Sequence, residues 1–132
     1  MSDFSHILAK VREFHDVFGI SSLDQPTSGI GEQQISLRHR LMAEENDEYL
    51  EAARNNDLTL VADALGDKLY ILCGTILAHG LQHKIVEVFE EIHRSNMSKL
   101  GPDGKPVRRD DGKVMKSELY FPPDINSILE KS

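Results

Sequence analysis

Residues 58–78, LTLVADALGDKLYILCGTILA, form the stretch that decides the fold. Apolar side chains lie on most sides of a helix built from this stretch, so the helix is either buried or part of an oligomer interface. Asp57 is a good N-cap, and Gly80 follows the last helical residues. A preceding helix, predicted from an N-cap near Ser36 to about residues 55–56, is separated from it by a very short turn. The two helices should therefore be antiparallel neighbours.

Two further helices and a hairpin are predicted around this pair. Apolar residues at three- and four-residue spacing predict a first helix from about Phe4 to Phe18, and a loop follows over residues 20–35. A fourth helix should run from about Leu81 to Ser98. Residues 107–109 and 113–116 can pair across Asp-Asp-Gly as a small hairpin. The sequence thus predicts an all-α fold, a four- to five-helix bundle with antiparallel central helices, a small C-terminal hairpin arm and an oligomeric assembly.

Length and charge restrict the class of protein. The 132 residues suit a single domain, 1–132, with a helical core over about 1–100 and a basic arm and tail over about 101–132. Twenty-two acids against fifteen bases give a net charge of −7, which argues against nucleic-acid and membrane binding. The longest apolar stretch, residues 69–78, is about half of a membrane span. A lone cysteine, Cys73, favours a reducing compartment, so we expect a cytoplasmic protein.

Carboxylates occupy helix positions where apolar residues are expected. On the second helix, steps from Leu37 and Leu41 lead to Glu44 or Glu45 and then to Glu48. On the third, the acidic residues Asp63 and Asp67 are four apart and share one face. The antiparallel arrangement would set the two acidic patches opposite each other.

A divalent cation would make such a cluster tolerable. Burying unpaired carboxylates costs several kcal/mol, and no histidine ligand is convincing here. Oxygen ligands alone favour Mg²⁺ or Mn²⁺, and Mg²⁺ bound in this way commonly also binds substrate phosphates. The run EENDE at 44–48 would by itself be typical of a solvated helix face, whereas the third helix offers little polar face to explain its two acids.

At these residues the sequence resembles the all-α nucleoside triphosphate pyrophosphohydrolase superfamily: MazG-like proteins, dimeric dUTPases and phosphoribosyl-ATP pyrophosphohydrolase. Their pattern is Glu-x-x-Glu on one helix and Glu-x-x-Asp on the next. Glu45–Glu48, preceded by Glu44, matches the first half, and Leu65-Gly66-Asp67 matches the end of the second. The resemblance covers roughly residues 36–98 and continues, in a MazG-like subgroup, through SNMSKLGPDGKPVRRDDGKVMK and YFPPD.

The chain departs from this pattern at one position. The Glu expected three residues before Asp67 is Ala64, and the nearest acid is Asp63. We therefore expect Asp63 to take the missing role, although it is shorter and displaced by about 100° around the helix. The predicted metal ligands are thus Glu45, Glu48, Asp63 and Asp67.

The resemblance implies Mg²⁺-dependent hydrolysis of a nucleoside triphosphate to the monophosphate and pyrophosphate, as in nucleotide-pool house-cleaning. Glu44 or Glu45 would be the base that activates water. It also implies a homodimer or a homotetramer. Two alternatives stay open: hydrolysis of phosphoribosyl-ATP, and a non-catalytic helical dimer that binds nucleotides or a protein partner.

Polar residues after the acidic helices are candidate substrate ligands. Asn96 and Lys99 fall at the end of the fourth helix, where Asn suits a base edge or ribose and Lys suits a phosphate. Lys113 and Lys116 on the hairpin are candidate phosphate ligands. The opposing interpretation is an ordinary polar helix end followed by a solvated loop.

Overall fold

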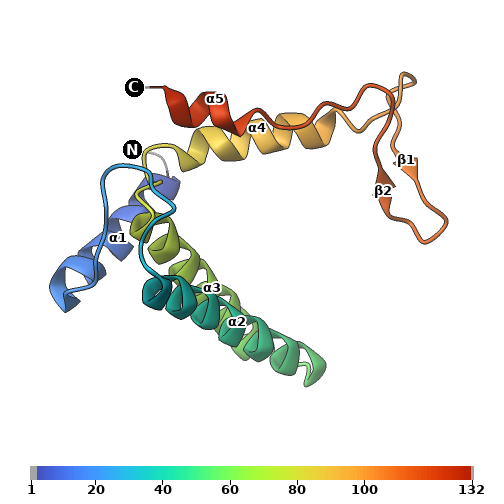
Figure 1. Cartoon of the computed structure of the whole chain (residues 1–132). Coiled ribbons are helices and arrows are strands. Elements are labelled where there is room, and N and C mark those ends of the chain that lie inside the picture. The colour runs from blue at the N-terminus through green and yellow to red at the C-terminus, as the bar shows by residue number, and fades with distance from the viewer. Residues whose placement is uncertain (1–2, 132) are drawn as a thin grey trace. The chain divides into compact units, whose positions relative to one another are not determined.

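The computed structural model describes residues 3–131, and the chain divides into two compact units at the junction of His83 and Lys84. The first unit holds α1 (Asp3–Phe18), α2 (Glu32–Arg54) and α3 (Leu58–Ala78). The second holds α4 (Ile85–Met97), β1 (Val107–Arg108), β2 (Val114–Met115) and α5 (Ile125–Glu130) (Figure 1). Residues 3–131 are all-α apart from one two-stranded sheet, as predicted.

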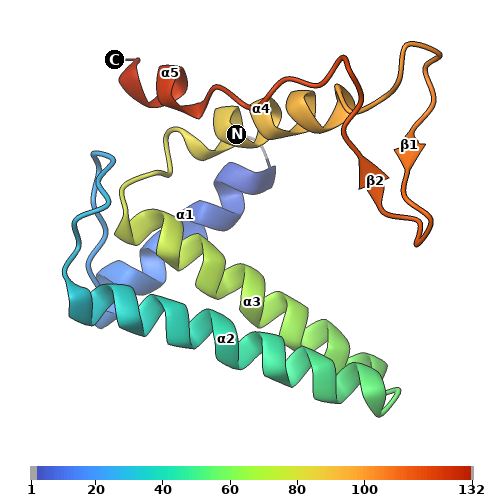
Figure 2. The same ribbon diagram turned by 45° about the vertical axis from the view of Figure 1, so that its right-hand side comes forward.

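Helices α2 and α3 lie side by side as antiparallel neighbours in both views (Figures 1 and 2). Asp57 begins α3 as predicted, because its side chain accepts a hydrogen bond from the backbone N–H of Leu60 at 3.1 Å. The tight turn before it places Asn56 at a positive φ of 54°. This turn sets the relative direction of the two helices that carry the acidic residues.

Helix α1 packs against α3 and supplies much of the first unit's core. Leu8 and Val11 of α1 and Cys73 and Leu77 of α3 are buried. Cys73 is completely buried, and burial raises the pKa of its thiol. It is therefore a packed structural thiol, as the apolar stretch around it indicates.

The loop between α1 and α2 is tied to the end of α3. Leu23 N–H donates to Leu77 O and Thr27 N–H to His79 O, both at 2.9 Å. Gly80 has a φ of +67°, and a Cβ there would collide with the backbone of Gln25. Glycine is thus required at the point where the loop crosses the end of α3.

Two predicted helix starts are wrong by four residues. Helix α2 begins at Glu32 rather than near Ser36, and its N-cap, Gly31, makes no side-chain cap bond. Ser36 instead donates to Glu32 Oε1 at 2.9 Å within the helix. Helix α4 begins at Ile85 rather than Leu81, also without a side-chain cap. Both starts lack the cap signal on which a sequence-based prediction depends.

In the second unit, a short hairpin and a returning segment follow α4. The strands pair antiparallel with Val107 opposite Met115 and Arg108 opposite Val114, as predicted. The segment 117–131 then runs back and ends in α5, whose N-cap Asp124 accepts from the Ser127 N–H. No helix among residues 3–131 combines the length and apolarity that crossing a membrane would need.

Much of the apolar surface of α3 is open within this chain. The stretch is apolar on most sides, as the sequence shows, but only part of it packs against α1 and α2. Its exposed apolar side chains are Leu58, Leu60, Leu65, Leu69, Tyr70 and Leu72. At these residues the helix is therefore not buried within its own chain. An oligomer interface is the other environment expected for such a helix.

Candidate metal and phosphate site

Three carboxylates from α2 and α3 converge where these two helices lie alongside each other. Glu45, Glu48 and Asp67 each offer an oxygen, and these oxygens lie within 4.8 Å of one another. Glu45 and Glu48 are three apart, so both project from one face of α2. Asp67 meets them from α3 because the two helices run antiparallel.

Glu45 is the most enclosed member of this group. Its Oε2 atom is shielded from solvent and has no hydrogen-bond partner among the described residues. Burial raises the pKa of Glu45 above its usual range, and the neighbouring Glu48 carboxylate raises it further. The negative charges of Asp67 and Asp63 act in the same direction. A positive charge close to these carboxylates would therefore stabilise their ionised form.

The other predicted metal ligands are more exposed than the sequence suggests. Glu48, Asp63 and Asp67 are exposed, so the expectation that all four acids are buried is wrong for this chain. The buried residues on these parts of α2 and α3 are instead the small residues Ala52 and Ala64.

Asp63 lies one helical turn before Asp67 on α3, outside the group of three. It lines a depression of about 270 Å³ together with Glu48 and Glu51. Ala64, at the position where the superfamily pattern has Glu, is 2% exposed in the wall of the same depression. Sequence reasoning missed Glu51, although its spacing of three residues from Glu48 repeats the spacing between Glu45 and Glu48.

Two charged neighbours stay outside the group of three. Glu44 is exposed, and its Oε1 atom lies 4.0 Å from Arg40 Nε. Lys68 Nζ donates to Asn46 Oδ1, so this lysine bridges α3 to α2. Among the described residues, Glu44 therefore does not join the converging oxygens, while Lys68 helps to hold the two helices together beside them.

The predicted substrate ligands all belong to the second unit. Asn96 and Lys99 line one depression of about 380 Å³, whose apolar wall is formed by Met97, Leu100, Pro106 and Val114. Lys113 and Lys116 are exposed on the hairpin. The Lys116 ammonium lies 4.7 Å from the centre of the Tyr120 ring, a cation–π contact. Asn96 and Lys99 are thus brought together beside a surface that could take a flat ring.

The donor set of the acidic group fits a hard divalent cation. Carboxylate oxygens are the ligands that Mg²⁺ and Mn²⁺ prefer, and one residue of the group, Glu45, also has a buried oxygen without a partner among the described residues. A cation there would neutralise a cluster whose acids otherwise repel one another.

Comparisons with known proteins place the chain in a family. A family model described as phosphoribosyl-ATP pyrophosphohydrolase matches residues 11–96, well over half of the chain. No curated protein matches. Twenty-four chains of solved structures match. One is from Exiguobacterium sp. 255-15 and is provisionally described as an NTP pyrophosphohydrolase. It has 26% identity and a TM-score of 0.49, over 93% of each chain.

Proposed function

Because the chain belongs to the phosphoribosyl-ATP pyrophosphohydrolase family and is thus a pyrophosphohydrolase, we propose that it cleaves a nucleoside triphosphate between the α and β phosphates. The products are the monophosphate and pyrophosphate. The role we propose is nucleotide-pool house-cleaning in the cytoplasm, where the free thiol of Cys73 is stable in its reduced form.

The observation that carries this proposal is the convergence of Glu45, Glu48 and Asp67, together with the buried Glu45 Oε2 atom, which has no hydrogen-bond partner among the described residues. These residues would hold Mg²⁺ or Mn²⁺, with Asp63 as the fourth predicted ligand. The chemistry that such an ion supplies when bound is positive charge against the phosphate oxygens.

The protein's own carboxylates provide the base. Glu44 and Glu45 are the two candidates for accepting a proton from the attacking water. Glu45 belongs to the group of three that would hold the ion, which favours it as the base. Glu44 lies on the same helix outside this group, beside Arg40.

Substrate contacts are assigned to the second unit. Asn96 would bond the base or ribose, and Lys99, Lys113 and Lys116 would bind phosphates. The apolar wall beside Asn96 and Lys99 offers a face for the base or sugar.

A nucleotide panel with Mg²⁺ tests the proposal. The purified full chain is incubated with each ribo- and deoxynucleoside triphosphate, and both pyrophosphate and orthophosphate are measured. We expect pyrophosphate, and a loss of at least about a hundredfold in kcat/KM for Glu48→Gln. Glu90→Gln, which changes an exposed glutamate on α4, serves as the matched control. Orthophosphate release, or no turnover of any nucleotide, would contradict the proposal.

Phosphoribosyl-ATP is the alternative substrate, favoured by the description of the matching family model. Including it in the panel decides between the two, because the better substrate has the higher kcat/KM. A non-catalytic nucleotide-binding dimer is the second alternative, favoured by Ala64 in place of the family glutamate. Calorimetric titration with Mg²⁺ separates it, because only the enzyme should bind the ion and lose it in Glu48→Gln.

We also propose a homodimer or a homotetramer. The exposed face of α3 carries Leu58, Ala62, Leu65, Leu69 and Leu72 at alternating spacings of four and three residues. This spacing is that of the apolar seam along which helices pack in pairs. A second copy of the chain would cover it.

A further inference from the structure

We propose that Ser117 is a positioning residue for Lys99. Its hydroxyl fixes the backbone from which the lysine extends toward a substrate phosphate. This inference rests on the proposed function, because it takes Lys99 as a phosphate ligand.

The Ser117 hydroxyl lies against the backbone on both sides of Lys99. Its Oγ is 3.1 Å from the carbonyl oxygen of Ser98 and 2.7 Å from that of Leu100, and it can donate to either. It also accepts a hydrogen bond from the backbone N–H of Leu119 at 3.1 Å. One half-buried side chain thus joins the returning segment to the two residues that flank Lys99.

Lys99 lies just beyond the end of α4, where regular helical hydrogen bonds no longer fix the backbone. Helix α4 ends at Met97, and Ser98 is its C-cap. The Lys99 N–H reaches Asn96 O at 3.2 Å, and the Leu100 N–H reaches Met97 O at only 3.3 Å. Carbonyl groups at a helix end need partners from outside the helix. Ser117 supplies that partner at the residues that set the direction of Lys99.

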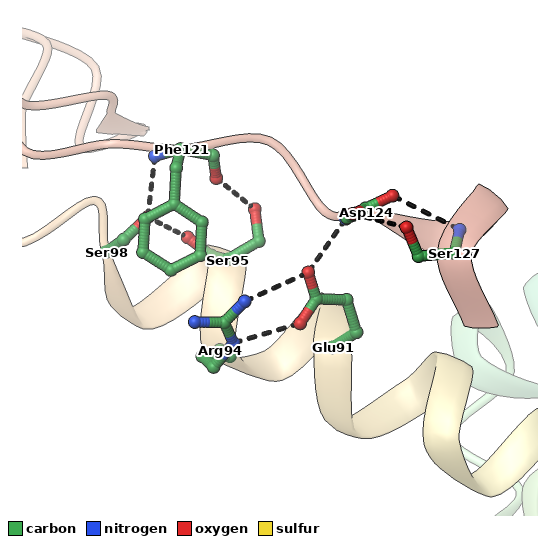
Figure 3. A network of polar contacts seen from close by, with 7 residues as sticks. All are labelled: Glu91, Arg94, Ser95, Ser98, Phe121, Asp124 and Ser127. Carbon is green, nitrogen blue, oxygen red and sulfur yellow. Dashed lines mark hydrogen bonds and ion pairs between the residues drawn. The ribbon is translucent and has the colours of Figure 1, made fainter.

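The segment that carries Ser117 is itself held along α4, as Figure 3 shows. Ser95 Oγ donates to Phe121 O at 2.8 Å, and the Phe121 N–H donates to Ser98 Oγ at 3.1 Å. Further along, the Asp124 N–H donates to a Glu91 carboxylate oxygen at 2.7 Å. Two residues of the segment are thus bonded to α4 and its C-cap by three hydrogen bonds before any ligand arrives.

The Arg94 side chain adds a cation–π contact with the ring of Phe121, which lies on the same segment. Its guanidinium carbon lies 4.7 Å from the ring centre, and Glu91 pairs with the same guanidinium. With the segment anchored in this way, Ser117 has a fixed place from which to hold Lys99. A ligand group held in place before binding costs less entropy when the substrate arrives.

Steady-state kinetics of the full chain test this role. Loss of one such hydrogen bond should raise KM about three- to tenfold in Ser117→Ala, with kcat changed less than about twofold. Ser117→Thr keeps the hydroxyl and should restore KM. In the Lys99→Ala background, Ser117→Ala should add no further increase, because the lysine it positions is already gone.

The matched control is Ser127→Ala, which removes a hydroxyl from the same segment. That hydroxyl donates to Asp124 at 2.8 Å, away from Lys99. The control should leave KM unchanged. Ser117→Cys, which nearly preserves the side-chain volume, replaces Ser117→Ala if the alanine variant fails to fold.

Two outcomes overturn the inference while leaving the proposed function standing. One is an unchanged KM in a folded Ser117→Ala or Ser117→Cys variant of an active enzyme. The other is the same increase in KM with and without Lys99, which would show a merely structural effect. Failure of the wild-type chain to release pyrophosphate from any nucleotide would instead overturn the proposed function, and this inference with it.

Discussion

At the scale of single residues, Arg38 and His15 form a buried basic pair in the first unit. Arg38 is 6% exposed and donates to Thr75 Oγ1 at 3.0 Å and to Ile71 O at 2.9 Å. Among residues 3–131 it forms no ion pair within 4.0 Å. His15 is 2% exposed, and its Nδ1 lies 2.9 Å from Ser22 Oγ. Burial, and then the charge of Arg38, lower the pKa of His15.

This lowered pKa predicts a loss of stability in acid. Above the ordinary histidine pKa of 6.5, His15 is neutral in both the folded and the unfolded chain. Below it, the unfolded chain takes up a proton that the folded chain resists, so the free energy of unfolding falls until the pH passes the folded pKa. The slope from this one group is at most about 1.4 kcal/mol per pH unit.

Urea unfolding at pH 7, 6 and 5 measures this effect. His15→Asn should keep a polar atom near Ser22 without titrating, so its stability should fall less steeply with pH than that of the wild type. Equal slopes for the two proteins would show that His15 does not carry the effect.

Gly74 shows how closely this pair is packed. A Cβ at residue 74 would lie 2.5 Å from Arg38 Nη2 and 3.0 Å from His15 Nε2. Gly74→Ala should therefore destabilise the fold by about 1–3 kcal/mol through overpacking. Gly66 is the matched control on the same helix, because a Cβ there meets nothing within 4 Å. Gly66→Ala should stabilise by about 0.5–1 kcal/mol in the same thermal unfolding experiment. Equal effects at the two positions would contradict this packing argument.

At the scale of elements, helix ends were predictable where a side chain marks them. Asp57 marks the start of α3, and its bond to Leu60 confirms the prediction. Gly31 and Lys84, the N-caps of α2 and α4, make no side-chain cap bond. The sequence therefore carried no local signal there, and tertiary packing set both starts.

Removing the Asp57 cap tests how much that signal contributes. Asp57→Ala should lower the free energy of unfolding by about 1 kcal/mol, because the Leu60 N–H loses its partner. Asp57→Asn can still accept this hydrogen bond and should lie within a few tenths of a kcal/mol of the wild type. The prediction fails if the two variants are equally destabilised in chemical denaturation.

Helical spacing predicted only part of the geometry of the acidic group. The spacing of Glu45 and Glu48, with an antiparallel partner helix, was enough to expect that they meet Asp67. The separation of Asp63 from the converging oxygens depends on the rotation of α3 about its axis, which residue spacing alone does not fix. The shielding of Glu45 Oε2 likewise depends on tertiary packing. The role of these residues as ligands stays a prediction.

At the scale of the whole molecule, the two units have unequal cores. The first unit buries Leu8, Val11, Cys73 and Leu77, whereas Ile128 is the buried large apolar residue of the second unit within residues 84–131. The second unit also exposes Val86, Phe89 and Ile92 along α4. Burying this apolar surface against another copy of the chain would add stability, as the proposed assembly requires.

The α3 seam makes this expectation specific. This seam is the exposed apolar face formed by Leu58, Ala62, Leu65, Leu69 and Leu72. Burial of each leucine at a subunit interface contributes about 1.5–3 kcal/mol, so a lysine at Leu65 or Leu72 should weaken the assembly at least tenfold. Sedimentation of the wild type should give two or four times the chain mass of 14.9 kDa, whereas Leu65→Lys and Leu72→Lys shift toward the single chain. Leu119→Lys, a change at an exposed leucine outside the seam, is the control and should sediment like the wild type. A wild type that sediments as one chain at all concentrations would refute the assembly, and intact oligomers in both seam variants would place the interface elsewhere.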